Sequence, residues 1–142
     1  MKTGRLALAA ILLASQPALA QIPAGAEEVI RMLGLTNVRL HPDARGPDAT
    51  GTLPGGALVE LDFHRDGTLE EIEADGRDLA PFAALAPVLP EALQKDEKLA
   101  GSTIEQLEFD NDGIEIEGRD RDGNRFKAEY TASGQLREWK RD

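Results

Sequence analysis

The chain has 142 residues, a formal net charge of −10 and no cysteine. Its acidic balance disfavours nucleic acid as a partner, because the phosphate backbone would be repelled. Without cysteine, neither a disulfide nor lipid attachment at a cysteine is available, so folding must depend on packing alone. This length fits one compact unit, or two small units that share a sheet.

The N-terminal segment, Met1–Ala20, has the pattern of a secretory signal peptide. Lys2 and Arg5 precede an apolar run, Leu6–Ala14, and small residues end at Ala20. The run is too short to span a membrane, so cleavage is favoured over an uncleaved anchor, and no membrane insertion is expected afterwards. Because residues 1–20 hold two basic and no acidic side chains, the remaining residues carry a net charge of −12. We therefore predict a periplasmic or secreted protein, whose charge serves solubility or, alternatively, an acidic docking face.

Two stretches of the remaining chain repeat one pattern. Residues 34–72 align with residues 101–139 without a gap, at an offset of 67, and ten of the 39 positions are identical. Ordinary composition gives roughly two or three such matches. Half of the identities are glycines, which indicates that turns recur at matched places. We predict an α+β fold of two repeats, 21–76 and 77–142, each with helix and antiparallel β-meander. The meanders form one or two adjoining sheets with the helices packed on one face.

The first repeat begins with a predicted helix, Ala26–Leu33, which Gly34 ends. Alternation then predicts a short strand over Thr36–Leu40. The stretch His41–Gly56 contains three prolines and four glycines, so we expect a loop in which strand pairing is broken. A hairpin follows, with strands Leu58–His64 and Leu69–Glu73 around an Asp-Gly turn.

The second repeat begins with a predicted helix–loop–helix crossover, with helices over Leu79–Ala86 and Pro90–Leu99. The last forty residues predict a four-stranded meander, because apolar alternation is interrupted by turns at Asp110–Gly113, Asp122–Asn124 and Ser133–Gly134. Leu136 and Trp139 are spaced by three, as are the equivalent Leu69 and Ile72, which predicts a bulge after the glycine turn in both repeats.

The strand–turn–strand segment from Phe126 to Leu136, FKAEYTASGQL, resembles the PepSY-like family, whose exported domains end in strands of this form. Residues 58–73 look like a second, degenerate copy. The tandem layout is also similar to the beta-lactamase inhibitor protein fold, in which two helix-plus-sheet repeats build one concave sheet. This resemblance implies an exported, non-enzymatic binding or inhibitory module that contacts or restrains another exported protein, and it supplies no catalytic residues.

The residues themselves also offer little for catalysis. His41 and His64 are the only histidines, and their positions predict exposed side chains more readily than a catalytic base. No serine lies in a nucleophile elbow, and no glycine-rich loop has phosphate-binding spacing. We therefore predict a protein that is not an enzyme and has no cofactor. A catalytic pair of carboxylates would need a cleft lined by two acids of raised pKa.

Calcium is the alternative ligand. Glu108, Asp110 and Asp112 before Gly113 resemble the opening of an EF-hand loop, although Arg119 stands where a bidentate glutamate is needed. Turn chemistry explains these acids equally well. The candidate metal ligands, for a cation-responsive acidic domain, are Glu108, Asp110, Asp112, Asp120 and Asp122.

The candidate residues for binding a protein partner are aromatic. Phe63, Tyr130 and Trp139 could anchor an interface, because large aromatic side chains commonly do so. Their apolar neighbours at the strand period favour a core role instead. Trp139, which lies beside Lys140 and Arg141 near the C-terminus, is the best candidate for exposure.

Overall fold

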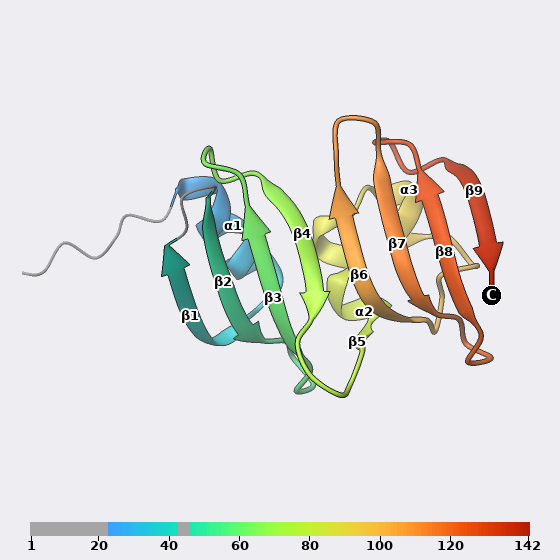
Figure 1. Cartoon of the computed structure of the whole chain (residues 1–142), viewed down its shortest axis with the longest axis horizontal. Helices are drawn as coiled ribbons and strands as arrows, with labels where there is room; N and C mark the ends of the chain where they lie inside the picture. The colour runs from blue at the N-terminus through green and yellow to red at the C-terminus, as the bar shows by residue number, and fades with distance from the viewer. Residues whose placement is uncertain (1–22, 43–45) are drawn as a thin grey trace, which may run out of the picture.

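The computed structural model describes residues 23–42 and 46–142, so the predicted signal peptide lies outside the described residues. Within them, one antiparallel sheet of nine strands runs in the order β1-β2-β3-β4-β6-β7-β8-β9, and β5 pairs with β6 beside this path (Figure 1). The elements in chain order are α1 (Ala24–Met32), β1 (Thr36–Pro42), β2 (Pro47–Thr52), β3 (Leu58–Phe63), β4 (Leu69–Ala74), β5 (Ala80–Pro81), α2 (Phe82–Leu85), η1 (Ala86–Val88), α3 (Glu91–Gln94), β6 (Thr103–Phe109), β7 (Ile114–Arg119), β8 (Arg125–Tyr130) and β9 (Leu136–Arg141). The predicted α+β class, with one joined sheet, is confirmed.

The helices lie together on one face of the sheet, with α1 behind β2 and β3 and with α2 and α3 behind the later strands (Figure 1). Strands β3 and β8 alternate between buried and less buried residues, as a sheet covered on one side requires. The core therefore fills the space between sheet and helices. Its largest fully buried side chains include Leu53, Leu61, Ile72, Leu85, Leu93, Leu99, Ile104, Leu107, Ile116 and Tyr130.

The two meanders follow one pattern at the constant offset that the sequence repeat shows. Each strand from β1 to β4 begins and ends at that offset before its counterpart among β6 to β9, as Thr36 precedes Thr103. The helices α1 and α3 also begin at this offset, and each follows an extended proline, Pro23 or Pro90. The correspondence seen in residues 34–72 thus extends through the described residues between positions 23 and 74.

Close backbone contacts are also repeated between the two meanders. Gly46 lies against the carbonyl of Phe63, and Gly113 lies against that of Tyr130. The two glycines are an equivalent pair in the repeat, and so are the two aromatic residues. The repeat therefore preserves the packing of one strand against another as well as the order of the elements.

The joint between the meanders is short. Strands β4 and β6 pair over three residues each, Glu71–Glu73 with Gln106–Glu108. The connection of residues 75–89 joins β4 to α3, and it places β5 against the start of β6. Among the described residues, no helix is long and apolar enough to cross a membrane.

The expected loop over His41–Gly56 is wrong. Strand β1 continues to Pro42, and Pro47–Thr52 forms β2, which pairs with both β1 and β3. Prolines are tolerated there because Pro42 ends an edge strand and Pro47 begins its neighbour, where an N–H is not required for the ladder. Gly51 lies inside β2 close to the Leu35 side chain, which would be only 3.3 Å from a Cβ at this position. Pro42 and Pro47 therefore mark strand ends, and Gly46 and Gly51 mark close contacts, not broken pairing.

The expected helices of the crossover are too long. In place of a helix over Leu79–Ala86 the chain forms β5, the single turn α2 and the 3₁₀ turn η1, and α3 stops at Gln94. Pro81 directly precedes α2, and Pro87 and Pro90 interrupt the helical backbone after it, which keeps the first of these helices short. The predicted bulges, in contrast, are confirmed, because the pairing register shifts between Asp62 and Phe63 and between Glu129 and Tyr130.

Candidate functional site

The face of the sheet opposite the helices carries polar side chains. The residues that alternate with the buried Val59, Leu61 and Phe63 of β3 are Glu60 and Asp62, which are half-buried. The same alternation in the other strands brings further acids to this side. We call this surface the open face.

A single row of acids crosses the open face from β2 to β9. The strand register places one carboxylate opposite the next at every step, in seven neighbouring strands. Adjacent strands lie about 4.8 Å apart, so the acids are immediate neighbours. We call these residues the carboxylate row: Asp48, Asp62, Glu71, Glu108, Glu115, Glu129 and Glu138.

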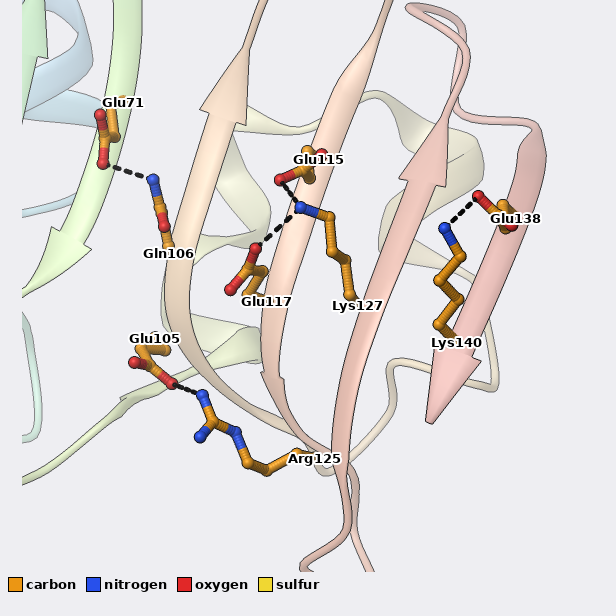
Figure 2. A network of polar contacts seen from close by, with 9 residues as sticks. All are labelled: Glu71, Glu105, Gln106, Glu115, Glu117, Arg125, Lys127, Glu138 and Lys140. Carbon is orange, nitrogen blue, oxygen red and sulfur yellow. Dashed lines mark hydrogen bonds and ion pairs between the residues drawn. The ribbon is translucent and has the colours of Figure 1, made fainter. Parts of the chain in front are cut away.

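In the second repeat, basic side chains offset part of this charge (Figure 2). The Lys127 ammonium pairs with Glu115 and lies 3.0 Å from Glu117, and these two carboxylates raise the pKa of Lys127. Lys140 lies 3.0 Å from Glu138. At the joint between the repeats, the Gln106 amide donates a hydrogen bond of 2.7 Å to Glu71. The charge of the acids of β7 and β9 is therefore partly offset by these two lysines.

In the first repeat, the acids face one another. Carboxylate oxygens of Asp48, Glu60 and Asp62 lie within 4.8 Å of one another. Burial and the nearby Glu60 charge raise the pKa of Asp62, although a hydrogen bond with Asp48 works in the opposite direction. Burial and the charge of Asp62 likewise raise the pKa of Glu71. Like charges opposite each other in a sheet are destabilising, so this part of the face favours the arrival of positive charge.

The sequence-predicted metal ligands do not come together. Asp110 and Asp120 each use one carboxylate oxygen to accept backbone N–H groups of their own turns, from residues 112 and 113 and from residues 122 and 124. Asp112 and Asp122 are exposed in these turns, while Glu108 lies in the carboxylate row. Within the described part of the chain, the acids close enough to share a cation are instead Asp48, Glu60 and Asp62. None of the five predicted ligands belongs to that group.

Two of the three candidate aromatic residues are in the core. Phe63 is 2% exposed and Tyr130 1%, so neither can contact a partner, and the Tyr130 hydroxyl donates a hydrogen bond of 2.9 Å to Asp96. Trp139 is half-buried and stacks on Phe126, with ring centroids 4.4 Å apart. Of the predicted aromatic set, Trp139 alone offers surface.

The carboxylate row was not predicted from the sequence. A signal was present within three of the strands, since acids are spaced by two on the polar side of β3, β4 and β7. The row itself depends on which acid faces which, and this register is set by the bulges in each hairpin. Asp48, moreover, lies in the segment expected to be a loop.

No family model matches the sequence, and no curated protein matches it. Solved structures do match. Two of them are each 17% identical over 84% of this chain. One is a protein of unknown function from Bacteroides vulgatus that has been assigned provisionally to the periplasm, with a TM-score of 0.50 and 92% of that chain covered. The other is a protein from Bacteroides thetaiotaomicron that has been assigned provisionally as a calcium-regulated periplasmic protein, with a TM-score of 0.51 and 91% of that chain covered. A third, a DUF2874 family protein from Bacteroides vulgatus that has been assigned provisionally to the periplasm, is 15% identical over 84% of this chain and 90% of that one, with a TM-score of 0.50.

The chain shares the fold of these three proteins. A BLIP-like protein from Bacteroides fragilis matches more distantly, with a TM-score of 0.40 and 11% identity over 87% of this chain and 89% of that one. The descriptions of the three proteins agree with the predicted export to the periplasm. The PepSY-like resemblance is not matched by a family model and remains a prediction.

Proposed function

We propose that this protein is an exported, non-catalytic binding module whose open face contacts a positively charged region of another exported protein. The observation that carries the proposal is the carboxylate row, with one acid in each of seven adjacent strands. A surface of one charge attracts a partner of the opposite charge and excludes partners of its own sign. Restraint of an enzyme is one consequence that such a contact can have.

The arrangement of charges supports this proposal because repulsion between the acids lowers the stability of the protein when no partner is bound. The raised pKa values of Asp62 and Glu71 mean that the folded protein holds these two acids in surroundings that oppose their ionised form. A residue set that lowers stability is the kind that functional surfaces carry. Basic groups from a partner would relieve the repulsion and so gain binding free energy at this face.

The row can be tested with defined charged peptides. We expect a lysine-rich peptide to bind in calorimetry at low ionic strength, and we expect the affinity to fall as salt is added, because exposed charges are screened. A glutamate-rich peptide of equal length should not bind. In the triple variant Asp62→Asn, Glu108→Gln, Glu129→Gln, the affinity for the lysine-rich peptide should fall at least about tenfold.

A matched control separates position from total charge. The triple variant Glu27→Gln, Asp75→Asn, Glu97→Gln removes the same three charges from exposed residues outside the carboxylate row. It should retain nearly the full affinity for the lysine-rich peptide. Equal losses in the two triple variants would show that only net charge matters, and the proposal of a binding face would then be wrong.

A second candidate function is that of a cation-responsive domain. The observation that favours it is the close approach of Asp48, Glu60 and Asp62, because calcium prefers several carboxylate oxygens. One protein of the same fold is provisionally described as calcium-regulated, which makes calcium the first cation to test. Calorimetry should show a saturable heat that Asp62→Asn removes and Asp110→Asn leaves intact. Absence of heat at about millimolar calcium would exclude this function.

A further inference from the structure

A second surface feature lies at the far end of the sheet from β1, beside the edge strand β9. A pocket of about 530 Å³ opens there, lined by Lys98, Asp120, Arg121, Asp122, Trp139 and Arg141. Three of these side chains are basic and two are acidic, which gives the pocket a net positive charge on a chain whose net charge is −10. The pocket therefore differs in sign from the rest of the molecule.

The first repeat shows that the fold does not require this charged set. The turn between β2 and β3 has the same backbone hydrogen bonds as the turn between β7 and β8: residue 53 or 120 donates to residue 57 or 124, at 2.8 and 2.9 Å, and accepts from residue 56 or 123. Yet the residues equivalent to Asp120, Trp139 and Arg141 are Leu53, Ile72 and Ala74. The same turn and strand positions are thus occupied by apolar residues in the first repeat and by a carboxylate, an indole and a guanidinium in the second.

Asp120 is the most unusual member of the set. Its side chain is 5% exposed, and its Oδ2 atom has no hydrogen-bond partner among the described residues, although it lies 3.2 Å from the Arg141 guanidinium. Burial opposes its charge, but hydrogen bonds from the backbones of Asn124 and Asp122, together with the Arg141 charge, hold the pKa of Asp120 below its ordinary value. Asp120 is therefore ionised and holds Arg141 at the pocket.

The remaining basic groups are available to a ligand. Within the described residues, the Lys98 ammonium pairs with no carboxylate and lies 5.4 Å from the centre of a Trp139 ring. Arg121 donates one hydrogen bond of 3.3 Å to the Glu97 carbonyl, and a guanidinium has five N–H groups in all. Because the Trp139 indole also stacks on Phe126, it provides a fixed apolar surface beneath these charges.

We infer that this pocket binds a carboxylate attached to an apolar body, with the carboxylate against Lys98, Arg121 and Arg141 and the apolar part against Trp139. Such a group occurs on small organic acids and at the C-terminus of a polypeptide that ends in an apolar residue. The pocket shares no residue with the carboxylate row and has the opposite charge, so this inference does not depend on the proposed function.

The chain contains one tryptophan, so its fluorescence reports on this pocket directly. We expect N-acetyl-leucine to change the emission of Trp139 saturably, with a dissociation constant in about the millimolar range, as its size allows. N-acetyl-leucinamide, which lacks the charge, should bind at least about tenfold more weakly. Hexanoate and acetyl-Ala-Ala-Leu distinguish the two sources: tighter binding of the peptide assigns a polypeptide C-terminus, and equal binding assigns a small acid.

Three variants complete the test. Lys98→Met should weaken the binding of N-acetyl-leucine at least about tenfold. Lys95→Met, which removes the same charge from a lysine outside the pocket, should leave this binding unchanged. Asp120→Leu introduces the residue that the first repeat carries, so it should keep the fold. It should weaken binding although it removes a negative charge, because Arg141 is no longer held at the pocket. No saturable change up to about 20 mM acid, equal binding of acid and amide, or equal effects of the two lysine variants would overturn the inference.

Discussion

The two repeats share one backbone plan but fill it with different side chains. The register pairs Leu61 with Ile72 in the first repeat and Ala128 with Trp139 at the same places in the second. A large and a small residue thus replace two medium ones, with the bulk moved to the edge strand. Backbone geometry is therefore the constant feature of the repeat, while volume and charge are free to differ between the central strand β4 and the edge strand β9.

The largest effects should come from the glycines that this shared geometry requires. A Cβ at Gly46 would lie 1.8 Å from the Phe63 carbonyl oxygen, and one at Gly113 would lie 2.0 Å from that of Tyr130. Because backbone cannot move aside cheaply, alanine at either position should lower the free energy of unfolding by about 4 kcal/mol or more. Urea denaturation measures this.

Gly55→Ala is the control for these glycines, because an added Cβ there meets no atom within 4 Å and only its positive φ of 100° opposes a side chain. Its cost should be about 1–2 kcal/mol. If alanine at Gly46 or Gly113 were no worse than alanine at Gly55, the close approach of the two strands would not be a requirement of the repeat.

The core pair gives the next largest effect. Leu61→Ala should lower the free energy of unfolding by about 2–5 kcal/mol, because Ile72 cannot fill the space that Trp139 fills beside Ala128. The reverse change, Ala128→Leu, should cost about 1–3 kcal/mol through overpacking. Thermal and urea denaturation measure both. A neutral Ala128→Leu would mean that Trp139 can move away freely, and that the two pairs do not compensate in volume.

A hydroxyl distinguishes the buried aromatic residues of the two repeats. Tyr130 bonds Asp96, whereas its counterpart Phe63 has no hydroxyl. Tyr130→Phe should lower the free energy of unfolding by about 1–2 kcal/mol, since the lost hydrogen bond has a carboxylate acceptor and is partly buried. In a double-mutant cycle with Asp96→Ala, the two losses should be less than additive. Full additivity would show that the bond contributes nothing to stability.

The sequence predicted the parts of the fold where local pattern and tertiary structure agree. The strands β3 and β8 were recognisable from alternation in Leu58–Phe63 and Arg125–Tyr130, and the bulges from the spacing of Leu69 and Ile72. Strand β2 was not predicted, because Pro47 and Gly51 are poor strand formers whose places are set by neighbours far along the chain. Strand propensity is a property of the single residue, whereas the positions of Pro47 and Gly51 are explained by their tertiary contacts.

The candidate surfaces were less predictable for the same reason. Glu71 and Glu108 are far apart in the sequence, and only the β4–β6 pairing makes them neighbours. Trp139 was selected from the sequence as the most exposed aromatic residue, but the cations around it come from the turn that follows α3, from the β7–β8 turn and from the end of β9. A sequence without the strand register identifies residues that can belong to such sites, but it does not show which of them lie together.

The smallest effects should separate the two halves of the carboxylate row. Asp62→Asn removes a repelled charge and should raise the free energy of unfolding at pH 7 by about 0.2–1 kcal/mol. Glu115→Gln removes a partner of Lys127 and should lower it by a similar amount. Chemical denaturation of both variants checks the opposite signs. If both variants were stabilised, Lys127 would not offset the charge of the second repeat.

The pH dependence tests the same contrast. Because the folded pKa of Asp62 lies above its unfolded value of about 4, the folded state binds more protons between the two values, and stability falls as pH rises through that window. Asp62→Asn should remove part of this fall, so the two proteins should differ least below the window and most above it. Denaturation from pH 3 to pH 8 measures the difference. A gap that widened as the pH fell would mean that Asp62 is stabilised, not opposed, by its neighbours on the open face.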